Sequence, residues 1–222
     1  RPKADNTGSF NAVILGANNL VNYKVPFAMR ATVTGINQSS LVEFVELCGS
    51  IPCRFVSVSP VSITGRAEES GIEELEPEVF VHNYFLAKQR AKELGVELSI
   101  PSDYLDNVSA RYCNGDGESM AVMPEGFISC CTRVTQSSDI LSDLFFIGEF
   151  TSQGIEIWQD KVDNLKRYNL YNFNECDSCF VKFSCSGGCH HTRILNGGVQ
   201  PESYCKVIKS ILWNTLQEAV SS

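Results

Sequence analysis

The chain has 222 residues, a formal net charge of -8 and ten cysteines. This length suits one domain of moderate size or two small ones, and both can bury a proper core without disulfides. The acidic balance, with no local cluster of lysine or arginine, argues against nucleic acid and anionic membrane surfaces as partners. No apolar run reaches the roughly 18 residues of a membrane span and no signal-peptide pattern opens the chain, so we expect a cytoplasmic protein with reduced cysteines.

The first 60 residues alternate between helix and strand patterns. Apolar residues recur every three or four positions over 10–21, which predicts an amphipathic helix, and the period changes to two over 27–34, which predicts a strand. Ser40 and Glu43 have the spacing of a capping box, which predicts the start of a second helix, and a second strand is expected at 54–59. Helix and strand in alternation with short joints predict an α/β domain with a parallel sheet.

The sequence pattern changes from alternating helices and strands to short strands and loops after a long helix. This helix is expected over 77–94, where Pro77 suits its start and Gly95 its end. Short strands are then expected at 119–123 and 127–134, joined by a turn into a hairpin. Further helices are expected over 154–168 and 201–220. These patterns predict an α/β domain over 1–95 and an α+β domain with short hairpins and cysteine-rich loops over 96–222.

Four cysteines lie within fourteen residues, in the spacing C-x2-C-x5-C-x3-C that runs from Cys176 to Cys189. Cysteines this close cannot mostly pair as disulfides without strain, whereas several thiolates that converge on one point suit an iron-sulfur cluster or a soft metal. Gly187 and Gly188 can adopt backbone angles closed to other residues, so the chain can wrap closely there. Structural zinc is the alternative, because four cysteines at similar spacing also form zinc sites.

Seven cysteines carry a resemblance to a known family: Cys113, then Cys131 as the end of Gly126-x4-Cys131, then Cys176, Cys179, Cys185 and Cys189, and finally Cys205. This pattern resembles the SPASM domain of radical S-adenosylmethionine enzymes. The family includes sulfatase maturases and enzymes that modify ribosomally made peptides. The resemblance implies two auxiliary 4Fe-4S clusters in the second domain.

The resemblance also implies which cysteines bind which cluster. It assigns Cys176, Cys179, Cys185 and Cys205 to a distal cluster, and Cys113, Cys131 and Cys189 to a proximal one. Only three cysteines then hold the proximal cluster, and its fourth ligand is left open between Cys130, a substrate group and water. On a strand Cys130 points opposite to Cys131, which favours a buried thiol.

The first 95 residues resemble the latter half of a radical S-adenosylmethionine barrel, through Gly8-Ser9-Phe10, the strand at 30–34 and Gly65-Arg66-Ala67. The catalytic C-x3-C-x2-C motif of the family does not occur in the sequence. We therefore expect the chain to be the carboxyl-terminal part of a longer enzyme, inactive without an amino-terminal barrel portion. We also expect an apolar sheet edge that a second copy of the chain covers.

Four polar strand residues are implied to contact S-adenosylmethionine in such a barrel. They are Arg30 and Thr34 on one strand and Ser57 and Ser59 on the next. The alternative is the ordinary alternation of a strand, with polar side chains that hydrogen-bond to one another.

Several other residue types of chemical interest have ordinary explanations. Cys48 and Cys53 are expected in the core, as small apolar side chains. His190 and His191 directly follow Cys189 and could supply a ligand or a proton, but a place at the surface or behind the ligands is favoured. Near Cys113, Asp116 and Glu118 could take a proton from a substrate, although solvated loop carboxylates are commoner.

The resemblance implies an enzyme that modifies a side chain of a peptide or protein, with S-adenosylmethionine bound by the barrel and the auxiliary clusters transferring electrons or binding substrate. The alternative is a non-catalytic module that binds an iron-sulfur cluster or zinc and recognises a peptide.

Overall fold

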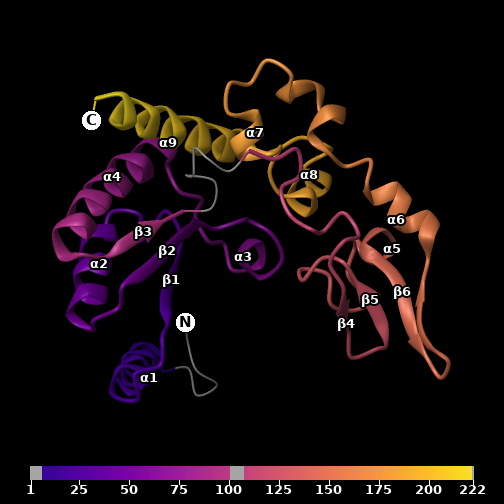
Figure 1. Cartoon of the computed structure of the whole chain (residues 1–222), viewed down its shortest axis with the longest axis horizontal. Coiled ribbons are helices and arrows are strands. Elements are labelled where there is room, and N and C mark those ends of the chain that lie inside the picture. Colours follow the sequence, from indigo (N-terminus) through magenta and orange to yellow (C-terminus); the bar gives the residue numbers. More distant parts are fainter. Residues whose placement is uncertain (1–6, 101–107, 222) are drawn as a thin grey trace. The chain divides into compact units, whose positions relative to one another are not determined.

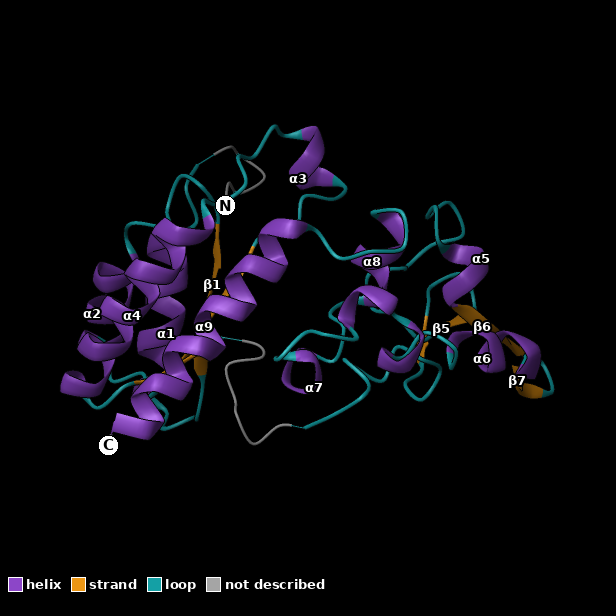
Figure 2. Cartoon of the chain, turned by 90° about the horizontal axis from the view of Figure 1, so that it is seen from above, coloured by secondary structure: helices purple, strands orange, loops and turns teal. Residues whose placement is uncertain are grey.

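The structure, a computed structural model, describes residues 7–100 and 108–221. The chain divides into two compact units, Arg1–Asp103 and Tyr104–Ser222. The first unit combines helices with a parallel sheet, and the second combines short helices with an antiparallel sheet. Figure 2 shows how much of each unit consists of loops between these elements. The expected mixture of helices with parallel and antiparallel sheets is therefore present.

The helices and strands of the first unit follow the expected alternation. They are α1 (Phe10–Asn22), β1 (Ala28–Val33), α2 (Leu41–Ser50), β2 (Phe55–Pro60), α3 (Arg66–Glu69), α4 (Pro77–Leu94) and β3 (Glu97–Ser99). The three strands pair in parallel in the order β1-β2-β3. Strand β3 lies beyond Gly95, so the first unit extends past the expected domain boundary.

Helices α2 and α4 pack against each other and cover one face of the parallel sheet (Figure 1). Val33, Val56 and Val58 are buried on this face, because alternate side chains of a strand point to the same side. On the other face Arg30 of β1 lies in register with Ser57 of β2. Helix α4 ends as expected, since Gly95 takes a left-handed φ of 67°.

The second unit has many short elements and one long terminal helix. They are β4 (Ala121–Val122), β5 (Phe127–Ser129), α5 (Ser142–Phe145), β6 (Phe146–Thr151), β7 (Gly154–Ile157), α6 (Gln159–Leu165), η1 (Leu170–Asn172), η2 (Asn174–Cys176), α7 (Lys182–Cys185), α8 (His190–Leu195) and α9 (Glu202–Ser221). The strands form an antiparallel sheet in the order β4-β5-β6-β7. The expected hairpin is β4-β5, although β5 ends before Cys130.

The expected helix over 154–168 is wrong in its first third. Residues 154–157 form β7, which pairs with β6, and only α6 is helical. Gly154 has a φ of 117°, which closes a tight hairpin after Thr151. Gly148 on β6 permits the pairing, because an added Cβ there would overlap the carbonyl oxygen of Glu156.

The core of the second unit lies between the antiparallel sheet and α6. Its fully buried members include Ile128, Phe145, Ile147 and Leu165, and Phe127 stacks on Phe146 with ring centroids 4.8 Å apart. A smaller cluster of Val181, Ile208 and Leu212 connects α9 to the cysteine-rich loops. Across the described residues, no helix has the length and apolar character that a membrane crossing needs.

Candidate metal centre

Three successive residues with left-handed φ angles separate Cys185 from Cys189. Ser186, Gly187 and Gly188 have φ angles of 53°, 76° and 73°. An added Cβ on Gly187 would lie 2.6 Å from Cδ2 of Phe173, so the backbone packs against this ring. The backbone at Gly187 and Gly188 is thus closely packed, as expected, and it packs against protein side chains.

Four cysteines of the second unit form one neighbourhood, called here the four-thiol set: Cys176, Cys179, Cys185 and Cys205. Burial raises the pKa of the Cys185 thiol to about 11, a hydrogen bond with Tyr204 opposes this, and the other three members raise it further. The pKa of Cys205 is also raised, by burial first and then by Cys176 and Cys179, against an opposing effect of Lys209. The Cys185 thiol therefore lies in the field of the other three thiols.

Three other cysteines form a second neighbourhood, the three-thiol set: Cys113, Cys131 and Cys189. Burial raises the pKa of Cys131, a backbone hydrogen bond from Arg133 lowers it, and Cys189 and Cys113 raise it. The pKa of Cys113 is raised by burial and by Cys189, against the N–H of Gly115, which lies 3.4 Å from its Sγ. This grouping is the one that the cysteine pattern implies, while ligation of iron stays a prediction.

Two tyrosines lie between the sets. The pKa of the Tyr112 phenol is raised by burial and then by Cys189 of one set and Cys185 of the other, while a hydrogen bond with Tyr204 lowers it. The hydroxyl of Tyr204 lies 3.8 Å from Sγ of Cys185. Each tyrosine directly precedes a cysteine of a set, which is a signal that sequence reasoning missed.

The thiols of each set lie near one another but do not surround a common metal position. All ten cysteines are free, and Cys113 is the most exposed of the seven. Among the residues that the structure describes, no three His, Cys, Asp or Glu side chains lie in an arrangement that could hold a metal ion as placed. Metal binding at either set therefore requires side-chain adjustment.

Arg193 on α8 was not predicted, and it is the most heavily engaged side chain near the four-thiol set. The residue is 1% exposed, and its guanidinium lies over the Phe173 ring at 3.7 Å. It pairs with Glu175, and its Nη2 lies 3.8 Å from Sγ of Cys176. The sequence does place Arg193 one helical turn beyond Cys189, which could have indicated that the two residues are near each other. Nothing in the sequence indicates that the Arg193 side chain is buried.

Arg133 has a similar relation to the three-thiol set from an exposed position. Its Nη1 donates to Oγ1 of Thr192 at 3.0 Å and lies 3.8 Å from Sγ of Cys189. Each set therefore has one arginine beside one of its sulfur atoms, buried in one case and exposed in the other.

The remaining cysteines are core residues. Cys130 is 4% exposed, its Sγ lies 3.4 Å from the carbonyl oxygens of Gly115 and Phe145, and burial raises its pKa to about 12. The preference for a buried thiol at Cys130 is confirmed. Cys48 and Cys53 are buried in the first unit, as expected.

His190 and His191 are both buried, which excludes the surface and leaves a place behind the proposed ligands as the prediction, and burial lowers the pKa of both. The expectation of a solvated carboxylate near Cys113 is wrong for Asp116, because only 2% of its side chain is exposed and its Oδ2 pairs with Arg111 at 2.9 Å. In both cases tertiary packing buries groups that local sequence would leave in water.

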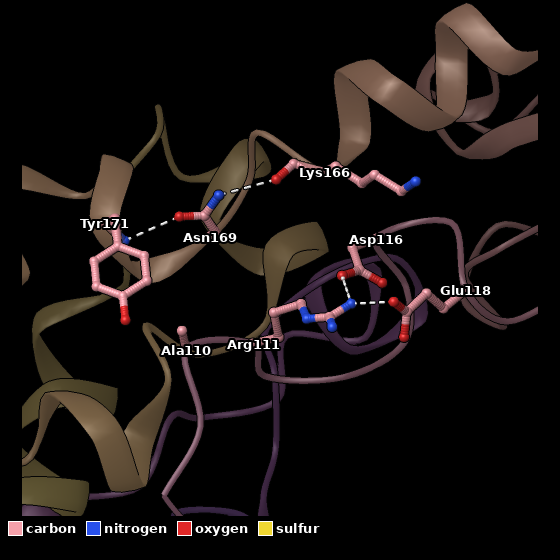
Figure 3. Close-up of a pocket in the computed structure, with 7 residues that line it drawn as sticks. All are labelled: Ala110, Arg111, Asp116, Glu118, Lys166, Asn169 and Tyr171. Carbon is pink, nitrogen blue, oxygen red and sulfur yellow. Dashed lines mark hydrogen bonds and ion pairs between the residues drawn. The ribbon is translucent and has the colours of Figure 1, made fainter.

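A pocket of about 390 Å³ lies beside the segment that carries Cys113 (Figure 3). Its lining residues are Ala110, Arg111, Asp116, Glu118, Lys166, Asn169 and Tyr171. The guanidinium of Arg111 is fixed between Asp116 and Glu118, and the N–H of Leu170 donates to the carbonyl of Ala110 at 3.1 Å. These contacts hold the two walls of the pocket together.

The structure brings together three of the four polar strand residues of the first unit. Nη2 of Arg30 donates to Oγ of Ser59 at 3.1 Å, and Ser57 lies in register with Arg30. Thr34 lies beyond the end of β1, where its N–H donates to Oδ1 of Asn37 at 2.8 Å. The observed contacts are those of the ordinary alternative, polar side chains that bond to one another.

Comparison of the sequence with known protein families finds no match, and comparison with curated proteins finds none. Functional inference therefore depends on the cysteine neighbourhoods. The residues of these neighbourhoods fit iron-sulfur chemistry, because free thiols are the ligands of such clusters. The buried Nε of Arg193 also fits, because it has no hydrogen-bond partner among the described residues and hydrogen bonds to sulfur are common at cluster sites. Four thiols also fit zinc.

Proposed function

We propose that the chain is part of a radical S-adenosylmethionine maturase and that its second unit binds two auxiliary 4Fe-4S clusters. The four-thiol set would hold one cluster and the three-thiol set the other. When bound, such clusters supply one-electron transfer or an open iron for a substrate group. The chain's own residues position the thiols, shield them and connect the two sets.

One pattern carries this proposal: Cys176, Cys179 and Cys205 raise the pKa of Cys185, whereas Cys189, only four residues further on, acts with Cys113 on the pKa of Cys131. A single tetrahedral zinc site would gather the four close cysteines of the C-x2-C-x5-C-x3-C run around one ion. The pKa causes instead associate Cys189 with Cys113 and Cys131, which are distant in sequence, and this supports a second centre. Seven thiols in two groups favour two centres.

The test is iron and sulfide content after anaerobic reconstitution. We expect about eight iron and eight sulfide per chain, as two 4Fe-4S clusters require. The double variants Cys176→Ala/Cys179→Ala and Cys113→Ala/Cys131→Ala should each retain about four iron, as expected if one cluster is lost. The control variant Cys53→Ala should keep the full content, because this thiol lies in the core of the first unit. One zinc per chain without sulfide would contradict the proposal.

The enzymatic part of the proposal requires a C-x3-C-x2-C segment, which these 222 residues lack. We expect the isolated chain to leave S-adenosylmethionine intact and the full-length enzyme to cleave it reductively into methionine and 5'-deoxyadenosine. Arg30, Ser57 and Ser59 are the residues of this chain proposed to contact the bound cofactor. Cleavage that persists undiminished in an Arg30→Ala enzyme would remove Arg30 from that role.

The substrate of such a maturase would be a peptide or protein, and the pocket beside Cys113 is our candidate for part of its binding site. Its volume suits one side chain with the adjoining backbone. The exposed Tyr171 ring offers an apolar wall, and Arg111 is held in place by two carboxylates. Tyr171→Ala should weaken binding of the cognate peptide without changing iron content, whereas Tyr23→Ala, an exposed tyrosine in the first unit, should change neither.

A further inference from the structure

Arg193 connects three separate segments around the four-thiol set. Its Nη1 donates to the carbonyl of Gly198 at 2.9 Å and pairs with Glu175, while its Nη2 donates to the carbonyl of Gly187 at 2.8 Å. The same Nη2 lies 3.8 Å from Sγ of Cys176. The guanidinium therefore fixes η2, the left-handed turn and the segment after α8 relative to one sulfur atom.

The charge on Arg193 is only partly balanced. Glu175 is its one carboxylate partner among the described residues, and 41% of that side chain is exposed, so water screens its negative charge. Lys209 adds a second cation whose field reaches Cys205. Arg193 therefore brings a positive charge into this buried place.

We infer that Arg193 is a positioning residue that orders the four-thiol set and raises the reduction potential of the iron-sulfur cluster bound there. This inference rests on the proposed function, since it requires a cluster at these thiols. Reduction adds an electron to the centre, and a buried cation next to a ligand sulfur stabilises the added charge. Hydrogen bonds to sulfur and local charge are known determinants of cluster potentials.

The same geometry assigns Glu175 the opposite effect. Its carboxylate counteracts the guanidinium, so its removal should leave more uncompensated positive charge near Cys176. A purely structural role for the Arg193–Glu175 pair predicts that loss of either partner harms the site in the same way. An electrostatic role predicts shifts of opposite sign.

The experiment is a redox titration monitored by electron paramagnetic resonance on the reconstituted chain, with the Cys113→Ala/Cys131→Ala background used to isolate the signal of the four-thiol set. We expect Arg193→Gln to move the midpoint potential to more negative values and Glu175→Gln to more positive values. Arg193→Lys keeps the charge and should lie between Arg193→Gln and the parent. The shift from Arg193→Gln should persist in high salt, because the group is buried.

The matched control is Lys182→Gln, a partly exposed cation at the start of α7 that donates to the carbonyl of Asp177. It should shift the potential less than Arg193→Gln. Unchanged potentials in both Arg193→Gln and Glu175→Gln, or shifts of the same sign, would overturn the inference while the proposed clusters stand. If Arg193→Gln binds no cluster, Glu175→Gln alone decides by the sign of its shift. Absence of iron and sulfide in the parent would overturn the proposed function itself, and the inference with it.

Discussion

Cys185 and Cys189 show how a single turn assigns neighbouring residues to different sites. Cys185 ends α7, where Tyr204 contacts its sulfur, and Cys189 precedes α8 beside Arg133. If each thiol serves one centre, Cys185→Ala should reduce the iron signal of the four-thiol set alone, and Cys189→Ala that of the three-thiol set alone. Iron content with electron paramagnetic resonance of each variant checks this. A Cys189→Ala protein with both clusters intact would contradict the assignment.

For these residues, sequence predicts a grouping of the cysteines but not their surroundings. The two groups of thiols stay a prediction from spacing and resemblance, because the pattern of cysteines is itself the signal. Arg193 and Asp116 could not be predicted as buried, since charged residues are mostly exposed unless paired and their partners, Glu175 and Arg111, are identified only by the fold.

Cys48 provides a pH-dependent prediction away from the proposed centres. Burial, followed by Cys53, raises its pKa to about 12, so the folded chain holds the thiol proton more tightly than the unfolded chain. The resulting stability is complete below the pKa of the unfolded thiol and is lost as pH rises toward that of the folded one. We expect the free energy of unfolding to fall by about 1–2 kcal/mol by pH 10 through this group.

Denaturant unfolding of the wild type and of Cys48→Ala between pH 7 and 10 checks this prediction. The variant is less stable throughout because it leaves a small cavity, but its stability should fall less steeply with pH. Parallel pH profiles for the two proteins would show that Cys48 does not carry the effect.

Among the elements, the turn between α7 and α8 is the one that the site depends on most. Gly187 combines a left-handed φ with a neighbour, Phe173, that leaves no room for a Cβ. Gly197 has a similar φ of 71° with nothing within 4 Å of an added Cβ, and so offers a matched control. Gly197→Ala should cost roughly 1–2 kcal/mol from backbone strain alone, and Gly187→Ala roughly 1–3 kcal/mol more from overpacking.

Thermal and denaturant unfolding of the two glycine variants gives the comparison. Equal losses of stability in Gly187→Ala and Gly197→Ala would mean that the Phe173 ring yields to the added methyl group. Because Gly187 also accepts a hydrogen bond from Arg193, its variant should additionally lose metal from the four-thiol set sooner under a chelator.

The elements differ in how well local sequence predicts them. Helix α4 was predicted with bounds close to those observed, because Pro77 and Gly95 mark its two ends. Strand β7 was mistaken for helix because Ile155, Trp158 and Val162 repeat at helical intervals. Residues 154–157 form a strand because they pair with β6. Strand β6 itself lies in a segment for which the sequence predicted no strand.

For the molecule as a whole, the first unit presents apolar surface that its described residues do not cover. Four large apolar side chains of α1 are exposed: Phe10, Val13, Leu15 and Leu20. Strand β1 is an edge of the described parallel sheet, so its free backbone groups lie in the same unit as this surface. We expect a second copy of the chain to bind this surface, so sedimentation velocity should show dimers whose fraction rises with protein concentration. Val13→Lys should shift the equilibrium toward monomer, whereas Ile140→Lys, an isolated exposed apolar residue of the second unit, should not. A wild-type chain that stays monomeric at every concentration would refute self-association through this surface.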